Sequence, residues 1–201
     1  MSEIQYVYVD ESGQVDGRGD ALHVGIAVVD AALREEAQRR LESLEQRIGK
    51  RGKWHGSSVK TKSEYFKGLI QTTAGPALYW FRSIVPCAYE EATACAAARA
   101  MRLAGGPDAR FIVIIDGLKK ASRQRVARIL REHQVRWREI QVNKREDSDS
   151  LLRLADALAG FVRDVHHRKE FALGLWPSAE GLVREVPDSP QSDGRRATNP
   201  D

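Results

Sequence analysis

One short segment constrains the fold of this chain more than any other. Residues 111–115 read Phe-Ile-Val-Ile-Ile, with no polar residue among them. Because side chains alternate between the two faces of a strand, a strand of this kind must be covered on both faces. Such a strand is typical of the centre of a sheet, usually a parallel one, with helices packed on both sides. The sequence therefore predicts an α/β fold.

The rest of the chain supplies the other elements of such a fold. Apolar runs at 4–9 and 21–29, separated by a turn-rich stretch, predict an antiparallel hairpin. Two helices are expected between the second and third strands. The full set is strands at 4–9, 21–29, 77–85, 111–115 and 135–142, and helices at 30–48, 61–72, 89–103, 119–133 and 150–167. Together they predict one domain with a mixed five-stranded sheet flanked by helices.

The composition fits a single folded domain followed by a tail. Hydrophobic residues make up 42 % of the 201 residues, which is enough for a core. No apolar run approaches the roughly 20 residues that a membrane-spanning helix needs. Residues 177–201 are rich in proline and contain no aromatic residue, so we expect a domain at 1–176 and a disordered tail. The chain shows no secretory leader and only two cysteines, and a cytoplasmic location is expected.

Positive charge is concentrated in one stretch of the chain. The net charge is only +4, but residues 119–145 contain ten basic and two acidic side chains. A polyanion such as nucleic acid is the natural partner of this excess, and a solvated helix face is the alternative. The expected nucleic-acid contacts in this stretch are Lys119, Lys120, Arg123, Arg128 and Arg131.

Two predicted strands end in the same way, with an aspartate after the last apolar residue. Asp10 follows the strand at 4–9, and Asp116 follows the strand at 111–115. If these strands are parallel neighbours, both aspartates lie at the sheet edge where α/β folds collect ligands. Two carboxylates this close repel each other unless a proton or a cation lies between them. For each aspartate alone, a role in starting a turn is the alternative.

The last predicted helix contributes further carboxylates. Asp156 has leucine, alanine and glycine as its neighbours one turn away, so it lies in the apolar stripe of the helix. A carboxylate there must be paired or bound to a metal, because leaving it bare costs several kcal/mol. A salt bridge to Arg153 is the structural alternative. Asp149 lies two turns earlier on the same face and is explained equally well as the helix N-cap.

These carboxylates predict metal-ion chemistry. Glu11 is a further candidate ligand, although strand alternation directs it away from Asp10 unless a turn begins there. Oxygen ligands without histidine or cysteine suit Mg²⁺ or Mn²⁺. Two such ions, about 4 Å apart, can hold the attacking and leaving oxygens of a phosphodiester while a metal-bound water attacks. The sequence predicts a nuclease of this type, with a metal site formed by Asp10, Glu11, Asp116, Asp149 and Asp156.

The same motifs carry a resemblance to a known family. Asp-Glu-Ser-Gly at 10–13, Ile-Asp-Gly at 115–117, and Asp-Ser followed by Leu-Ala-Asp-Ala-Leu-Ala-Gly within 149–160 resemble the "DESG" family, domain of unknown function 3800, found in bacteria and phages. The resemblance covers residues 4–167. It implies a ribonuclease-H-like fold and, by the usual chemistry of that superfamily, a divalent-metal nuclease. Asp10, Asp116 and Asp156 carry over as its catalytic ligands, and Glu11 belongs to the motif.

The resemblance extends to a basic segment in the middle of the chain. Residues 54–62 are similar to a short stretch of the family that mixes a histidine or an acid with lysines. This implies substrate contacts by Lys60 and Lys62, and a role for His55 as a proton shuttle. The chain departs from the family pattern at Arg153, where glutamine is usual. Three residues before the last helix compete for the fourth ligand position: Glu146, Asp147 and Asp149.

Two other functions are compatible with these residues. A ribonuclease-H-like module that binds nucleic acid or protein without catalysis would keep the fold, because a fold indicates an activity less firmly than a site does. A metal-dependent phosphatase or transferase acting on nucleotides would use similar ligands but would not bind oligonucleotides.

Overall fold

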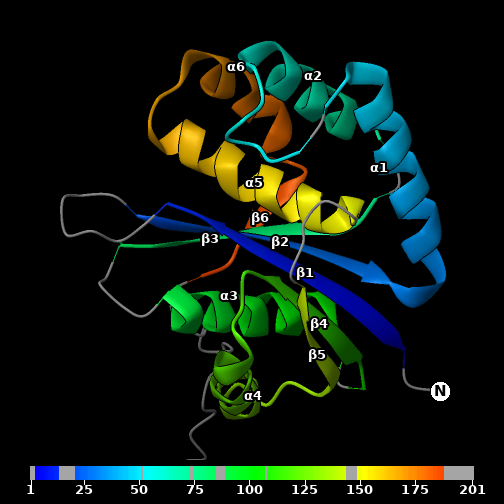
Figure 1. The fold of residues 1–201 in the computed structure, drawn as a ribbon, viewed down its shortest axis with the longest axis vertical. Coiled ribbons are helices and arrows are strands. Elements are labelled where there is room, and N and C mark those ends of the chain that lie inside the picture. The colour runs from blue at the N-terminus through cyan, green and yellow to red at the C-terminus, as the bar shows by residue number, and fades with distance from the viewer. Residues whose placement is uncertain are drawn as a thin grey trace, which may run out of the picture.

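A mixed sheet forms the framework of the protein (Figure 1). It has six strands in the order β5-β4-β1-β2-β3-β6, where β1 and β2, and β2 and β3, pair antiparallel and the other pairs are parallel. The strands are β1 (Ile4–Ser12), β2 (Leu22–Asp30), β3 (Ala77–Ser83), β4 (Arg110–Asp116), β5 (Trp137–Asn143) and β6 (Val183–Glu185). The structure, a computed structural model, describes residues 3–13, 21–50, 52–72, 75–84, 89–106, 108–143 and 149–187.

Helices cover both faces of this sheet (Figure 1). One face carries α1 (Arg34–Ile48), α2 (Val59–Ile70), α5 (Ser150–His166) and α6 (Glu170–Ala179), and the other carries α3 (Tyr89–Ala104) and α4 (Arg123–Glu132). Single 3-10 turns at 31–33 and 120–122 precede α1 and α4. The covering of both faces accounts for the uninterrupted apolar sequence of β4, as predicted.

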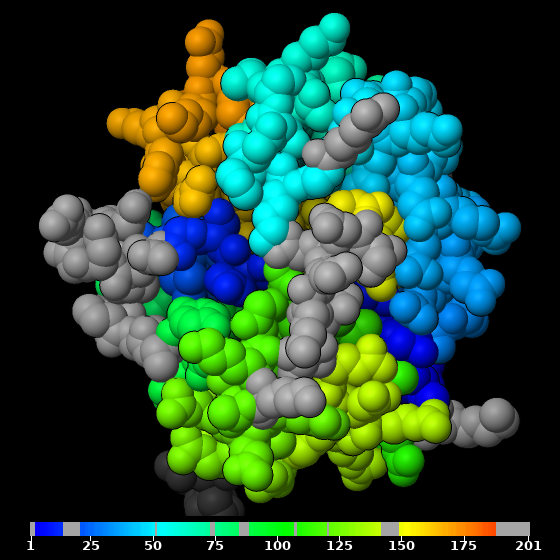
Figure 2. Space-filling model, viewed as in Figure 1, coloured from blue at the N-terminus to red at the C-terminus, as the bar shows by residue number. Residues whose placement is uncertain are grey.

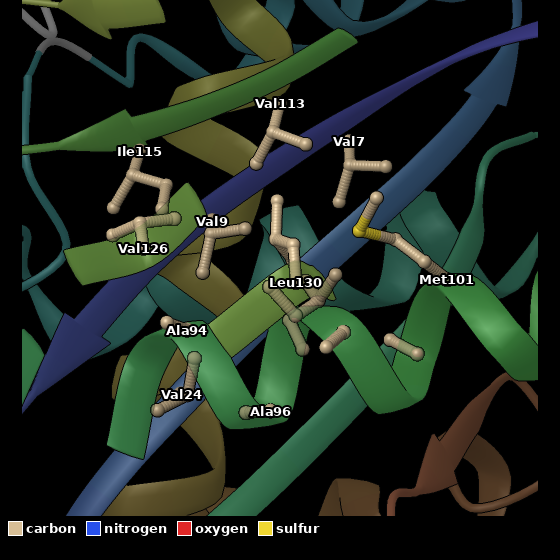
Figure 3. Packing of buried hydrophobic residues seen from close by; sticks show 14 of the residues in the cluster. Val7, Val9, Val24, Ala94, Ala96, Met101, Val113, Ile115, Val126 and Leu130 are labelled. Carbon is tan, nitrogen blue, oxygen red and sulfur yellow. The ribbon is translucent and has the colours of Figure 1, made fainter. Parts of the chain in front are cut away.

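Strand alternation divides the apolar side chains between two cores. Val7 and Val9 face α3 and α4, where they pack with Val113 and Met101 (Figure 3). The alanine-rich inner face of α3 lets this helix approach the sheet closely. Tyr8, between the two valines, belongs to the core on the α5 side. Asp10 continues the alternation of Tyr8, so it faces α5.

One close approach fixes the height of α5 above the sheet. A Cβ atom on Gly25 of β2 would lie 2.2 Å from the carbonyl oxygen of Ala155 and 2.6 Å from the backbone nitrogen of Ala159. Only glycine allows this separation. Gly25 pairs with Asp10 across the β1–β2 ladder. The contact therefore places the turn of α5 that contains Asp156 over the end of β1.

The structure confirms most of the predicted elements and corrects two predictions. The five expected strands and the helical insertion between the second and third are present, but the sheet has a sixth strand, β6. The domain also extends past residue 176: α6 ends at Ala179 and the Val186 side chain is buried in the core. A three-residue strand has too short a pattern to recognise, and its pairing with β3 is what orders it. Residues 188–201 lie outside the described residues. No helix in the described ranges is long and apolar enough to cross a membrane.

Candidate functional site

Two aspartates meet where β1 and β4 end. The parallel register pairs Val9 with Ile115, so the next residues on the two strands, Asp10 and Asp116, lie side by side. Both continue the alternation that faces α5, and both are buried, Asp10 to the point of being only 4 % exposed. The parallel-neighbour arrangement on which the sequence prediction depended is therefore present.

Asp156 approaches the same place from α5. Burial raises the pKa of Asp10 to about 8, and the neighbouring charges of Glu11, Asp156 and Asp116 contribute to that rise. Burial likewise raises the pKa of Asp116 and of Asp156. The charge of Asp156 thus acts on both Asp10 and Asp116, the two aspartates that the strand ends place side by side.

Glu11 joins these aspartates from the other face of the sheet. β1 continues to Ser12 without a turn at Asp10, so Glu11 alternates away from α5. Burial and then the charge of Asp116 raise the pKa of Glu11, and the charge of Lys53 lowers it, with a net rise to about 7. Glu11 and Asp116 are therefore neighbours around the strand ends. We refer to Asp10, Glu11, Asp116 and Asp156 as the carboxylate cluster.

Two oxygens of the carboxylate cluster lack partners. Asp10 Oδ1 accepts a hydrogen bond of 2.8 Å from the backbone N–H of Glu11. Asp10 Oδ2 and Glu11 Oε2 are buried and have no hydrogen-bond partner among the described residues. Burying carboxylate oxygens without a partner is unfavourable, and a divalent cation would compensate for it.

The donor set fits a hard divalent ion. All four members of the cluster offer carboxylate oxygens, the ligands that Mg²⁺ and Mn²⁺ prefer. In the described part of the chain, no three histidine, cysteine, aspartate or glutamate side chains are already arranged to hold one ion together. Binding an ion would therefore draw these side chains closer, and the two unpartnered oxygens are free of hydrogen bonds that such a movement would break.

A loop between α1 and α2 supplies a cation and a hydrogen-bond donor to the cluster. Lys53 Nζ lies 3.7 Å from Asp116 Oδ2, and the backbone N–H of Trp54 donates to Asp156 Oδ2 at 2.6 Å. His55 is exposed, and its charge lowers the pKa of Asp156. The role of His55 as a proton shuttle stays a prediction. The sequence reasoning missed Lys53, whose only signal was its position in the same basic loop.

Trp54 anchors this loop to α5. Its indole is buried, and the Nε1–H donates to Asp164 Oδ2 at 2.9 Å. A Cβ atom on Gly160 would lie 2.1 Å from the Trp54 ring, so glycine is required beside the indole. Lys62 Nζ pairs with Asp164 Oδ2 at 3.3 Å and lies 4.9 Å from the centre of the Trp54 ring.

Lys62 therefore has a different role from the one predicted. Its side chain is only 13 % exposed, and its ammonium compensates the buried carboxylate of Asp164. It is not available as a surface contact for nucleic acid. Lys60, two residues earlier on α2, is exposed.

Asp149 also differs from its predicted role as a metal ligand. It is the N-cap of α5, and its side chain accepts from the backbone N–H of Leu151 at 2.9 Å. It accepts a second bond from Gln38 and pairs with Arg34 at 3.5 Å. These contacts make Asp149 a helix cap held by α1, separate from the carboxylate cluster. Glu146 and Asp147 lie outside the described residues.

The structural alternative to metal binding was a salt bridge between Arg153 and Asp156. Arg153 does not form that salt bridge. Its guanidinium instead donates to both carboxylate oxygens of Glu45 on α1, at distances of 2.6 to 3.1 Å. Asp156 therefore has the Trp54 backbone as its hydrogen-bond donor and no arginine partner in the described contacts.

The basic stretch forms an exposed face on and beside α4. Its apolar side, with Val126 and Leu130, packs into the core, and its arginines face outward. Arg128 is paired with Glu132 on the same helix at 3.6 Å, and Arg131 lies over the Trp137 ring. In the space-filling view the helix, in green, forms much of the lower front of the molecule (Figure 2). The exposed members of the predicted contacts here are Lys119, Arg123, Arg128 and Arg131, and the side chain of Lys120 lies outside the described part.

Comparison with solved structures supports the fold. The crystal structure of ribonuclease H2 from Pyrococcus horikoshii OT3 superimposes with a TM-score of 0.57 at 18 % identity, and the match covers 82 % of this chain and 74 % of that one. No family model and no curated protein matches the chain, so the resemblance to domain of unknown function 3800 rests on its motifs alone. At this identity the structural match speaks for the fold and not for the activity. The chain has a ribonuclease-H-like fold.

Proposed function

We propose that this protein is a divalent-metal-dependent nuclease that hydrolyses phosphodiester bonds of DNA or RNA. The observation that carries the proposal is the carboxylate cluster itself: Asp10 and Asp116 adjoin on parallel strands, Asp156 faces them from α5, and buried oxygens of Asp10 and Glu11 lack partners. A structural cluster would be neutralised by its neighbours, whereas here burial first, and then the charges of Glu11, Asp156 and Asp116, raise the pKa of Asp10 to about 8. Such a site is suited to Mg²⁺ or Mn²⁺.

The residues of the chain have separate roles in the proposed reaction. Asp10, Asp116 and Asp156 would hold the metal, with Glu11 as a further ligand. A bound divalent ion supplies Lewis-acid activation of water and of the phosphodiester. His55, exposed beside Asp156, would accept a proton from the attacking water.

The exposed basic face provides a binding surface for the substrate. Arg123 and Arg128 lie on α4, which follows β4 and its Asp116 in the chain, and both side chains are exposed. Contacts of this kind are made to phosphates and are independent of base sequence. They would hold the nucleic-acid backbone while the cluster acts on one bond.

One observation favours a second function, a nucleic-acid-binding module without catalysis. Lys53 already places a cation within 3.7 Å of Asp116, and a cluster neutralised in this way could persist as a structural feature. The unpartnered oxygens of Asp10 and Glu11 argue against it, because Lys53 does not satisfy them. We therefore rank the nuclease first.

The test is cleavage of labelled single-stranded DNA, duplex DNA, RNA and hybrid with Mn²⁺, together with a thermal-shift titration of the metal. We expect at least one substrate to be cut, and Asp116→Asn to lower the rate by about 100-fold or more, because it removes a charged ligand. Asp116→Asn should also reduce the rise in Tm that Mn²⁺ produces. Asp108→Asn, a surface aspartate paired with Arg136, is the matched control. Oligonucleotide binding without a metal-dependent Tm shift would favour the binding module and contradict the nuclease.

A further inference from the structure

Lys53 brings a positive charge to the Asp116 end of the carboxylate cluster. Its ammonium lies 3.7 Å from Asp116 Oδ2 and its charge also lowers the pKa of Glu11 and of Asp156. The side chain is 46 % exposed, so the ammonium lies at the mouth of the carboxylate cluster and a substrate could reach it. In the space-filling view the cyan segment that contains it reaches toward the dark-blue end of β1 (Figure 2).

The backbone at Lys53 is held in place by the fold. The next residue, Trp54, is 1 % exposed. Its backbone N–H donates to Asp156 and its indole N–H donates to Asp164. Its indole fills the space beside Gly160 and packs edge-on against Phe66. The backbone of Lys53 is therefore fixed one residue away from a buried anchor.

The cluster is electrostatically divided by this lysine. The charges that shift the pKa of Asp10 most are all carboxylates, those of Glu11, Asp156 and Asp116. For Asp116 and Glu11 the charge of Lys53 acts in the opposite direction. Asp116 thus has a cation supplied by the chain, whereas Asp10 Oδ2 and Glu11 Oε2 are buried without a hydrogen-bond partner among the described residues.

We propose that Lys53 replaces one of the two divalent ions of a two-metal site, so that the cluster binds a single ion on the Asp10 side. This inference rests on the proposed function. Two divalent ions together with an ammonium would crowd five positive charges around four carboxylates, and the ammonium would repel a second ion on the Asp116 side. When substrate is bound, the ammonium would instead lie against a phosphate oxygen and stabilise the negative charge that develops there.

The test is the stoichiometry of Mn²⁺ binding to the full chain, measured by isothermal titration calorimetry and by the electron paramagnetic resonance signal of free Mn²⁺. We expect one ion per chain for the unaltered protein. Lys53→Met, which keeps the length of the side chain and removes the charge, should admit a second ion. Lys53→Arg, which keeps the charge, should bind one. Lys67→Met is the matched control, because Lys67 is an exposed lysine on α2 paired with Glu64, and it should also bind one ion.

Each outcome tests the role of Lys53, the proposed nuclease function, or both. Two ions bound by the unaltered protein, or one ion bound with equal affinity by it and by Lys53→Met, would overturn the role of Lys53. The first of these outcomes needs no variant and so does not depend on whether Lys53→Met folds. Failure to bind any Mn²⁺ would overturn both the inference and the nuclease. One bound ion in the unaltered protein and two in Lys53→Met, without cleavage of any substrate, would support the inference and overturn the nuclease alone.

Discussion

Two buried carboxyl groups pack against α5, and they differ in how their negative charge is compensated. Glu45 of α1 is 5 % exposed, and its carboxylate accepts three hydrogen bonds from Arg153 and pairs with Lys50 at 3.3 Å. Asp10 is 4 % exposed, has three carboxylates as its electrostatic neighbours, and keeps one oxygen without a partner. Equal burial therefore accompanies two cationic partners at Glu45 and only one backbone hydrogen bond at Asp10.

The difference separates a structural cluster from the one that we propose binds metal. Charges that are buried for stability are paired, because the cost of desolvation otherwise exceeds the gain. The Glu45 cluster meets this condition and joins α1 to α5. The carboxylate cluster does not, so its stability in the folded protein depends on a proton or a cation from outside. The next two predictions each change the compensation in one of these clusters.

We expect the largest effect from removing the arginine that compensates the buried charge of Glu45. Arg153→Met leaves Glu45 buried with only Lys50 as its partner, and we expect the free energy of unfolding to fall by about 3 kcal/mol. The loss should be the same with and without Mn²⁺, which urea denaturation under both conditions would measure. Arg128→Met, which breaks an exposed pair with Glu132, is the control and should cost less than about 1 kcal/mol. A loss for Arg153→Met no larger than that of the control would contradict the distinction.

A smaller effect of opposite sign is expected at the uncompensated cluster. The pKa of Asp10 in the folded state, about 8, lies above its ordinary value of 3.8, so ionisation opposes folding and the penalty grows as pH rises from about 4 through 8. Asp10→Asn removes that penalty and should stabilise the metal-free protein by roughly 1–3 kcal/mol at pH 8.5. With Mn²⁺ present the order should reverse, because only the unaltered protein gains a metal ligand. Thermal unfolding with and without Mn²⁺ would measure this, and destabilisation under both conditions would show that Asp10 is structural.

The sequence was sufficient for the part of the site that strand geometry determines. Asp10 and Asp116 could be placed together because each follows an apolar strand, and parallel neighbours end at the same edge. Asp156 could be added because a carboxylate in the apolar stripe of a helix requires an explanation. These inferences use periodicities of two and 3.6 residues, which the folded chain obeys.

The parts that were missed depend on contacts between distant segments. Lys53 and Lys62 lie in one basic segment, a loop followed by a helix. In the fold Lys62 pairs with Asp164, which also accepts from the Trp54 indole, whereas Lys53 lies near Asp116. Nothing local to the segment distinguishes the two lysines. Asp149 satisfied the patterns of a ligand and of an N-cap equally, and its hydrogen bond from the Leu151 N–H together with its contacts to α1 decides for the cap.

The smallest predicted effect concerns a third buried group, which avoids charge by staying neutral. His23 of β2 lies 2.9 Å from His166 of α5, Nε2 to Nδ1, and its pKa is lowered from 6.5 to about 4, by burial first and then by the charges of His166 and Arg82. Since the folded state disfavours the protonated form, the stability that His23 contributes is present above pH 6.5 and is lost as pH falls through 4. From pH 7 to pH 5 the loss due to this group should be about 1–2 kcal/mol.

Asp10 acts in the opposite direction over the same range, since a carboxyl whose pKa is raised becomes less costly as pH falls. The total change in stability therefore hides the histidine, and the comparison that isolates it is between the unaltered protein and His23→Gln. We expect urea denaturation of the metal-free proteins to show a smaller loss from pH 7 to pH 5 in His23→Gln, and no such reduction in His55→Gln, whose ring is exposed. Equal pH dependence in His23→Gln and the unaltered protein would mean that His23 does not remain neutral in the fold. A reduced dependence would show that His23 is accommodated by staying neutral, whereas Glu45 is accommodated by pairing with Arg153.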